Sequence, residues 1–271
     1  MNINVKRIFF LVFFFSLLSP SLYGQKRERK WYVMVVGVSD YFRPDIPKLT
    51  KPVSDADTVA QLFSTYNAEV LVLKNKEATG DSILSKMQTF FSRSTSYDNV
   101  LFFFSGHGYR SGFCPYDYGC TGHGYVSYDD IKNVFRRIQA NGRIILADAC
   151  FSGGLRPEQK PAQPDTVQVQ QALDPAVNKR KQQVMLFLSS RGYEPSYESP
   201  SMTNGYFTTY LKEALQGAAD VNRNGKVTAA ELHEYVSLKL KASLGDMQHS
   251  NMWGSFSKGW ILARVPVAAP K

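Results

Sequence analysis

The stretch Asn99-Val-Leu-Phe-Phe-Phe-Ser-Gly-His-Gly108 leads from a strongly apolar run straight into a glycine-flanked histidine. A second stretch, Arg143-Ile-Ile-Leu-Ala-Asp-Ala-Cys-Phe-Ser-Gly153, has the same layout around a cysteine. Short apolar runs bounded by turn residues are typical of buried strands in a parallel sheet. Ligands of open α/β sheets bind beyond the carboxyl ends of such strands. We therefore expect His107 and Cys150 to project from the ends of two adjacent strands into one crevice.

Strand-like and helix-like patterns alternate along most of the chain. Expected strands cover residues 31–38, 69–73, 99–104, 143–147, 184–188 and 260–265, and expected helices cover residues 54–66, 79–92, 127–138, 206–215 and 228–244. Alternation of this kind predicts an α/β fold, with a mostly parallel central sheet flanked by helices on both faces.

The first 24 residues have the layout of a secretory signal peptide. Lys6 and Arg7 precede an apolar run from Ile8 to Leu18, and Ser19-Pro-Ser-Leu-Tyr-Gly24 follows, with a small residue at its end. The alternative is a membrane anchor, but a spanning helix needs about 20 apolar residues and this run is shorter. We expect residues 1–24 to be removed and residues 25–271 to be exported, to the periplasm or the medium, without a stable membrane anchor.

Charge and composition limit the classes of partner. The chain carries 32 Lys and Arg against 23 Asp and Glu, a formal charge of +9, with basic clusters at 26–30 and 178–181. No basic stripe with interleaved aromatic residues is present, so nucleic acid is not an expected partner. Residues 155–183 are rich in Gln, Pro and Lys and read as a solvated linker. It divides one expected domain into parts 25–154 and 184–271.

Three cysteines in an exported chain favour one disulfide and one free thiol. Cys114 and Cys120 are close together in a loop and form the expected pair, which leaves Cys150 free. A zinc site formed by these two cysteines with His107 and His123 is an alternative, although the spacing between the cysteines departs from that of zinc knuckles. Two unpaired thiols are the third possibility.

A thiol beside an imidazole is the minimal equipment for nucleophilic acyl chemistry. His107 would supply a proton to the leaving amine, and backbone N–H groups of Gly108 and Cys150 would stabilise the oxyanion. The plainer alternative is a turn histidine and a buried core cysteine. His123 is a competing histidine, but it follows a turn-rich loop, whose support is less rigid than that of a strand.

The two motifs Ser105-Gly-His-Gly108 and Asp148-Ala-Cys-Phe-Ser-Gly153 together resemble those of the caspase/metacaspase superfamily of cysteine endopeptidases. Three further segments are similar to the exit of the family's first strand, the start of its first helix and its Gly-x-Phe-Thr segment: Gly37–Tyr41, Ser54–Asp57 and Gly205–Leu211. The resemblance spans nearly all of residues 25–271 and is stronger to bacterial metacaspase-like proteins than to animal caspases. It implies a caspase-like fold.

Residue roles follow from this resemblance. Cys150 matches the nucleophile and His107 the catalytic histidine, while Asp55, Ser105 and Asp148 match the pocket in which metacaspases bind a cationic side chain. The resemblance thus implies cleavage of protein or peptide substrates after Arg or Lys. For Asp55 the structural alternative is helix N-capping, and for Asp148 it is a hydrogen bond to a neighbouring turn.

Other interpretations stay open. Arg43 and Arg191 could build an acid-selecting pocket, which would give a related enzyme of different specificity. The basic run at 178–181 offers sites for self-cleavage within the linker, although such runs are also ordinary solvated clusters. A different class of protein is a catalytically silent module that binds peptide or calcium, with the loop Tyr109–Gly124 lying over the site.

The segment Asp220-Val-Asn-Arg-Asn-Gly-Lys-Val-Thr-Ala-Ala-Glu231 matches the pattern of an EF-hand calcium loop. Gly225 would make the turn, and the oxygen ligands would come from Asp220, Asn222, Asn224, the Lys226 carbonyl, Thr228 and Glu231. The alternative is a helix capping box of Thr228 with Glu231. Acyl transfer at a thiol requires no cofactor, so we expect calcium, where bound, to be structural.

Overall fold

A computed structural model describes residues 29–109, 112–120, 122, 124–150, 183–192 and 194–266. The expected signal peptide, nearly all of the expected linker and His123 lie outside these residues.

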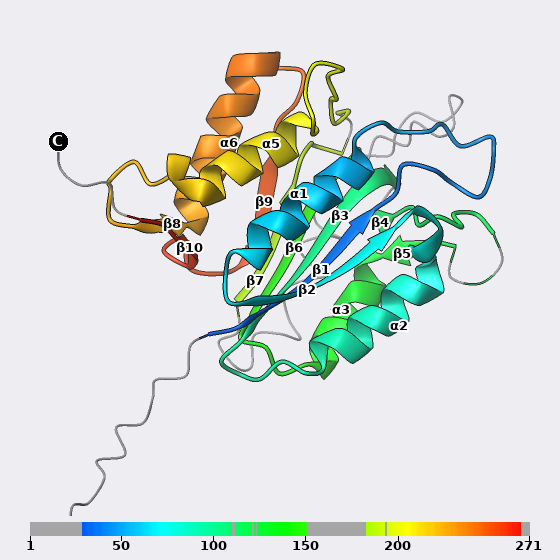
Figure 1. Ribbon diagram of the computed structural model, residues 1–271, viewed down its shortest axis with the longest axis horizontal. Helices are drawn as coiled ribbons and strands as arrows, with labels where there is room; N and C mark the ends of the chain where they lie inside the picture. The colour runs from blue at the N-terminus through cyan, green and yellow to red at the C-terminus, as the bar shows by residue number, and fades with distance from the viewer. Residues whose placement is uncertain are drawn as a thin grey trace, which may run out of the picture.

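The centre of the molecule is a mostly parallel sheet (Figure 1), as predicted. Its strands run in the order β2-β1-β3-β6-β7-β9, and every neighbouring pair is parallel except β7 with β9. The bounds are β1 Trp31–Gly37, β2 Ala68–Lys74, β3 Asn99–Tyr109, β6 Gly142–Cys150, β7 Gln183–Leu188 and β9 Asn251–Ser255. Because β1, β3, β6 and β7 are covered on both faces, their sequences are continuously apolar rather than alternating.

Helices cover both faces of this sheet and create two hydrophobic cores (Figure 1). One face carries α2 (Gly80–Phe91) and α3 (Tyr128–Arg137). The other carries α1 (Pro52–Ser64), α5 (Tyr206–Glu213) and α6 (Ala229–Leu244). Short helical turns follow β2 at Asn75–Glu77 and α5 at Ala214–Ala218.

Two small ladders lie outside the main path of the sheet. The end of β3 folds against β4 (Gly112–Phe113), which pairs with β5 (Val126–Ser127). The strand expected at residues 260–265 is β10 (Ile261–Arg264), but it pairs with β8 (Lys226–Thr228) instead of joining the central sheet. The edge position belongs to β9, a strand that the sequence does not predict.

Local capping explains where most helices begin. Thr79 caps α2, and α3 and α6 begin with complete capping boxes, Ser127 with Asp130 and Thr228 with Glu231. Helix α1 differs, because its N-cap residue Lys51 makes no side-chain cap bond. Asp55 lies in the first turn of α1, beyond the cap, so the N-capping interpretation of Asp55 was wrong.

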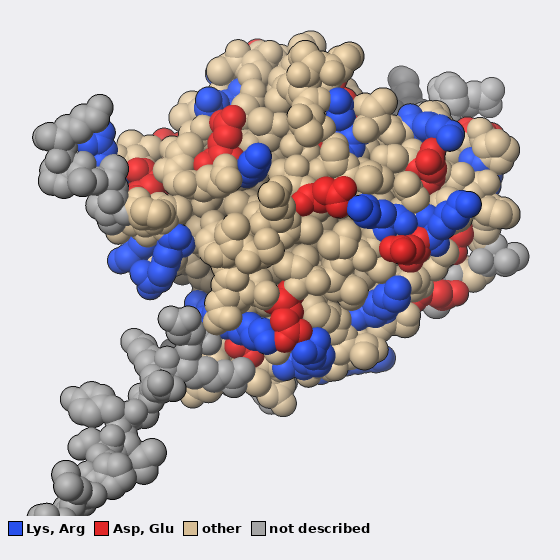
Figure 2. Space-filling view, viewed as in Figure 1, with Lys and Arg blue, Asp and Glu red and all other residues tan. Residues whose placement is uncertain are grey.

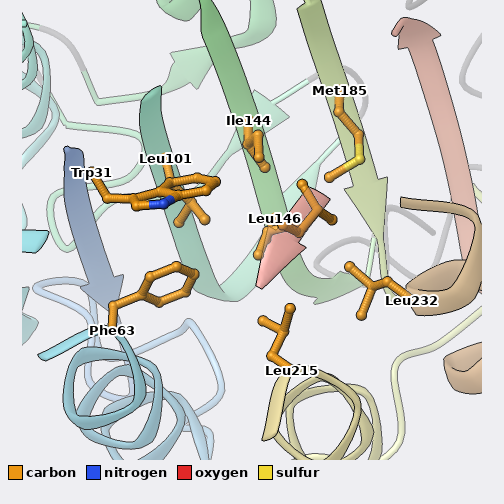
Figure 3. Close-up of a pocket in the computed structure, with 9 residues that line it drawn as sticks. Trp31, Phe63, Leu101, Ile144, Leu146, Met185, Leu215 and Leu232 are labelled. Atoms are coloured by element: carbon orange, nitrogen blue, oxygen red, sulfur yellow. The ribbon is translucent and has the colours of Figure 1, made fainter. Parts of the chain in front are cut away.

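Charge is mixed on one face of the molecule (Figure 2), and a cavity beside the sheet is apolar. On the face in Figure 2, basic and acidic side chains are interspersed and form no continuous basic stripe. Figure 3 shows a small cavity between the sheet and the helices of the second core, reaching from Trp31 to Leu232, whose exposed lining is wholly apolar. It has no polar group that would orient a ligand. No described helix is long and apolar enough to cross a membrane.

Candidate active site

His107 and Cys150 are direct partners in the parallel register of β3 and β6. Neighbouring strands lie about 5 Å apart, so the two residues are adjacent at the carboxyl edge of the sheet. The prediction that they lie together at adjacent strand ends is confirmed. Strand β3 continues through His107 because its end is held in a hairpin with β4, and Cys150 is the last residue of β6.

The imidazole of His107 is held from two sides. Its Nε2 lies 2.8 Å from the carbonyl oxygen of Pro47, which can only accept, so Nε2 carries the proton and Nδ1 is free to accept one. The backbone N–H of His107 donates to the Tyr41 hydroxyl at 2.8 Å, and the two rings lie 5.1 Å apart. A side chain at Gly106 would meet the Tyr41 hydroxyl at 3.1 Å, so glycine permits this approach. Burial lowers the pKa of His107.

The thiol of Cys150 is covered by the segment that follows β7. The Ser196 N–H donates to Cys150 Sγ at 2.7 Å, and the Ser196 carbonyl lies 3.6 Å from the same sulfur. Burial raises the pKa of Cys150 to about 11, although the Ser196 N–H opposes that shift. The resting pair is thus a neutral thiol beside a neutral imidazole. In the silent-module alternative the loop 109–124 would cover the site, whereas the contacts that the structure describes on Cys150 come from Ser196.

The backbone at the two strand ends presents N–H groups between β3 and β6. Cys114 N–H donates to the His107 carbonyl, which makes Gly108 and Phe113 a non-hydrogen-bonded pair. The Gly108 N–H therefore points away from β4. The Ala149 N–H donates to Ser189 on the β7 side, so the next N–H along β6, that of Cys150, points toward β3. Both N–H groups thus lie between β3 and β6, where the parallel ladder pairs His107 with Cys150, and their role in binding an oxyanion stays a prediction.

Asp55 lies beneath this edge and is buried with three donors around its carboxylate. Ser105 Oγ donates at 2.8 Å, Asn204 Nδ2 at 3.0 Å and the Gly205 N–H at 3.0 Å. Burial, reinforced by the charge of Asp148, raises the pKa of Asp55 to about 8. The predicted association of Asp55 with Ser105 is thus present, and Asn204 is an additional contact that the sequence did not indicate.

Asp148 is the second buried carboxylate of this pocket. It accepts hydrogen bonds from Ser196 Oγ at 2.6 Å and from Thr208 N–H and Oγ1 at 3.1 and 2.8 Å. Its pKa is raised, chiefly by burial. A Cβ on Gly205 would lie 2.7 Å from an oxygen of Asp148 and 3.5 Å from one of Asp55, so both carboxylates lie beside Gly205.

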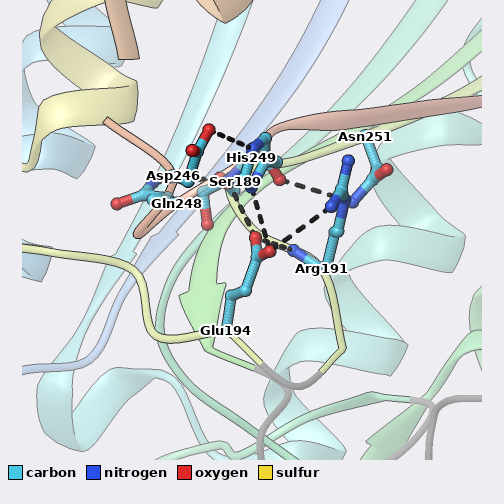
Figure 4. Close-up of polar contacts among 7 residues, drawn as sticks. All are labelled: Ser189, Arg191, Glu194, Asp246, Gln248, His249 and Asn251. Atoms are coloured by element: carbon cyan, nitrogen blue, oxygen red, sulfur yellow. Dashed lines mark hydrogen bonds and ion pairs between the residues drawn. The ribbon is translucent and has the colours of Figure 1, made fainter. Parts of the chain in front are cut away.

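The segment that covers Cys150 is anchored to the chain before β9. Glu194 accepts from the backbone and the imidazole of His249 at 2.8 and 2.9 Å, and the side chain of Gln248 donates to the Ser189 carbonyl (Figure 4). Gln248 also accepts from the Tyr197 N–H at 2.8 Å. These contacts fix both ends of residues 189–197, so the position of Ser196 over the sulfur is supported by several hydrogen bonds.

The alternative pocket built from arginines is not formed. Arg43 is exposed and pairs with Asp45, whereas Arg191 is exposed and pairs with Glu194. The donors to Asp55 and Asp148 named above are serine, threonine, asparagine and backbone groups.

The predicted disulfide between Cys114 and Cys120 is absent, because both residues have free thiols. Cys114 is fully buried in the core under β3, whereas Cys120 is partly exposed in the turn after residue 116, so the two thiols lie in different environments. The zinc alternative gains no support within the described residues, where no group of three or more His, Cys, Asp or Glu is arranged to hold a metal ion.

The segment 220–231 forms the turn that its sequence predicts, far from Cys150 along the chain. Asp220 accepts from the N–H groups of Asn224 and Gly225 at 3.0 and 2.8 Å, and Gly225 has a φ of 74°, which favours glycine. Glu231 accepts from Thr228 and from Asn222 Nδ2 at 2.6 Å. The capping-box alternative is thus present, and the carboxylates of the loop already accept hydrogen bonds from it.

Comparison with known proteins agrees with this geometry. A family model for the caspase domain matches residues 30–258. No curated protein matches the chain significantly. Among solved structures, that of protein GSU0716 from Geobacter sulfurreducens is similar, with a TM-score of 0.63 over 88% of this chain and 100% of that one. The two sequences are 17% identical, so this likeness concerns the fold alone.

Proposed function

Because the chain belongs to the caspase-domain family of cysteine peptidases, we propose that it is an endopeptidase that cleaves after Arg or Lys by a Cys150–His107 dyad. The observation that carries the proposal is the register pairing of these two residues at the carboxyl edge of the sheet. It brings the one thiol at this edge beside an imidazole whose Nδ1 is free to accept a proton.

The proposed reaction proceeds through a thioester. Substrate binding displaces Ser196 from the sulfur, the thiol proton passes to His107, and Cys150 Sγ bonds to the scissile carbonyl carbon. The N–H groups of Gly108 and Cys150 stabilise the resulting oxyanion. His107 then protonates the leaving amine as the C–N bond breaks, and water hydrolyses the thioester to release the acid and restore the thiol.

Specificity for a basic side chain is supported by the two buried carboxylates. Asp55 and Asp148 both lie beside Gly205, and a buried carboxylate without a cationic partner is energetically costly. A guanidinium or ammonium group bound there would satisfy both. Ser105 would orient Asp55, to which it donates a hydrogen bond. This pocket argues for cleavage after Arg or Lys rather than after Asp.

We further propose export of residues 25–271 and self-cleavage at the basic run 178–181, both inferred from the sequence. A purified, active preparation is expected to show two fragments on a denaturing gel. The Cys150→Ala variant is expected to stay intact, and an intact active enzyme would contradict self-cleavage. The amino-terminal residue of the exported protein, read by mass spectrometry, tests removal of the first 24 residues.

The decisive experiment uses peptides with a fluorogenic group after Arg, Lys or Asp. Purified residues 25–271 are expected to release the group after Arg and Lys, and both Cys150→Ala and His107→Ala are expected to abolish release. Release after Asp would retain the dyad and refute the acidic pocket.

A catalytically silent module is the second candidate, favoured by the contact of Ser196 with the sulfur. It predicts no release from any peptide and no labelling of Cys150 by a peptide electrophile.

A further inference from the structure

Glu198 joins the segment after β7 to the loop that leads into α1. Its Oε2 accepts from the Thr50 N–H at 3.2 Å and from Thr50 Oγ1 at 2.7 Å, and its Oε1 accepts from the Lys51 N–H at 3.4 Å. One carboxylate thus binds three donors of two consecutive residues. These residues are almost 150 positions away in the sequence, so the contact is a specific connection between the two parts of the domain.

The loop held by Glu198 also supplies the carbonyl that orients His107. Pro47 lies three residues before Thr50, and its oxygen accepts from His107 Nε2 at 2.8 Å. Before Pro47, the loop is fixed by burial of Ile46 in the core. After Pro47, it is fixed by the bond from Leu49 N–H to the Ser39 carbonyl and by Glu198.

The carboxylate of Glu198 is also near the reacting groups. Burial is the main cause of the pKa shifts of His107, Asp148 and Cys150. The charge of Glu198 adds to the raised pKa of Asp148 and of Cys150, and it opposes the lowering of the pKa of His107. A simpler role for Glu198 would be to cap α1, because Lys51 provides no side-chain cap. A cap alone would contribute to stability but would not affect the orientation of the imidazole.

We propose that Glu198 is a positioning residue, which holds the loop 47–51 so that the Pro47 carbonyl fixes the tautomer and orientation of His107. This inference rests on the proposed role of His107 as the proton donor. Through Glu198, the part of the domain after the linker would affect the orientation of His107, which belongs to the part before the linker.

The test compares Glu198→Ala with Glu198→Gln in steady-state cleavage of an Arg peptide by residues 25–271. Removing the carboxylate is expected to lower kcat roughly ten- to hundred-fold, the effect of misplacing a catalytic group by about 1 Å, with KM within about three-fold of wild type. The Gln side chain still offers an acceptor to Thr50, so kcat of Glu198→Gln is expected within about five-fold of wild type. Thr50→Val, which removes only the hydroxyl donor, is expected to fall between the two.

Two controls separate positioning from general damage. Asp57→Ala removes another carboxylate near the start of α1, one that pairs with the exposed Lys74, and it is expected to leave kcat unchanged. Thermal unfolding of each variant shows whether the fold is retained, and iodoacetamide labelling of Cys150 shows whether the thiol is still in place.

The outcomes distinguish the two proposals. Wild-type kcat in a folded Glu198→Ala variant would overturn the positioning role, as would a change confined to KM, which would indicate substrate binding. A Glu198→Gln variant as slow as Glu198→Ala would also overturn it, because charge rather than geometry would then matter. Full activity in His107→Ala, or no cleavage by the wild type, would refute the proposed function itself and with it the reaction that Glu198 serves.

Discussion

Ser196 contacts the nucleophile candidate Cys150 through its backbone N–H at 2.7 Å, and it contacts the acidic pocket through its hydroxyl at 2.6 Å from Asp148. One residue thus connects the sulfur and the pocket. A substrate that places its carbonyl at Cys150 and its cationic side chain near Asp148 must displace both contacts. The resting state is therefore closed, and we expect substrate binding and exposure of the thiol to be coupled.

The first prediction concerns the reactivity of Cys150. With a pKa raised to about 11, the thiol holds its proton at neutral pH, and only the thiolate reacts with alkylating agents. The rate of labelling by iodoacetamide is expected to be low at pH 7.5 and to keep rising toward pH 11. An ordinary cysteine would level off just above its pKa of about 8.5.

Mass spectrometry of the labelled peptides provides the reference within one sample. Cys114 is buried and is expected to stay unlabelled in the folded protein, whereas Cys120 is partly exposed and reports an accessible thiol. A plateau of the Cys150 rate near pH 8.5 would mean that burial by Ser196 does not persist in solution.

The second prediction concerns substrate choice. Asp148→Asn removes one of the two carboxylates that face the pocket, and loss of one partner of a buried charged contact costs about 2–5 kcal/mol. The value of kcat/KM for Arg and Lys peptides is expected to fall by roughly thirty-fold or more. Labelling of Cys150 by an uncharged electrophile serves as the control and is expected to change little. Equal cleavage of Arg peptides by wild type and variant would contradict the proposed binding of the basic side chain by Asp148.

The third prediction links the same pocket to stability. The pKa of Asp55 is about 8 in the folded state against 3.8 ordinarily, so the folded protein keeps a proton that the unfolded chain releases above about pH 4. The contribution of Asp55 to the free energy of unfolding is complete below pH 4 and is lost as the pH rises to about 8. Asp55→Asn does not titrate, so it is expected to unfold a few degrees above wild type at pH 8, and the difference should shrink toward pH 5.

Differential scanning calorimetry at several pH values measures this difference. Asp129→Asn, which changes an exposed carboxylate of α3, is the matched control and should follow the wild-type curve at every pH. A constant offset between Asp55→Asn and wild type would argue that no proton is retained in the pocket.

The parts of the fold that the sequence predicts are those whose strands are buried on both faces. The apolar runs of β1, β3, β6 and β7 leave no other assignment, and alternation with helices then determines a parallel sheet. Edge strand β9 was missed because Asn251-Met-Trp-Gly-Ser255 is short, partly polar and interrupted by Gly254, where φ is 129°. The apolar run of β10 predicts a strand but not its pairing with β8, since a strand pattern does not specify its partner.

The sequence predicts the two candidate catalytic residues but not the groups that contact them. His107 and Cys150 follow recognisable strand ends, and their register follows from the parallel sheet. The contacts of Pro47 and Ser196 use backbone groups, which every residue possesses and no motif records. No sequence pattern distinguishes Glu198 from other acidic residues, and only the structure shows its contact with Thr50.

The last prediction concerns calcium at the loop 220–231. Asp220 already holds the turn through Asn224 and Gly225, and we expect the loop to bind calcium with an affinity in the range of extracellular modules. Millimolar calcium should raise the unfolding temperature by about 2–4 °C. Asp220→Asn removes one of two charged ligands and should lose most of this shift, whereas Asp129→Asn should retain it. Because the loop includes β8, which pairs with β10 in a sheet separate from the one that carries Cys150, chelation is expected to leave kcat unchanged. If calcium does not change the unfolding temperature of the wild type, the calcium prediction is contradicted, and the capping box of Thr228 and Glu231 accounts for the sequence pattern at 220–231.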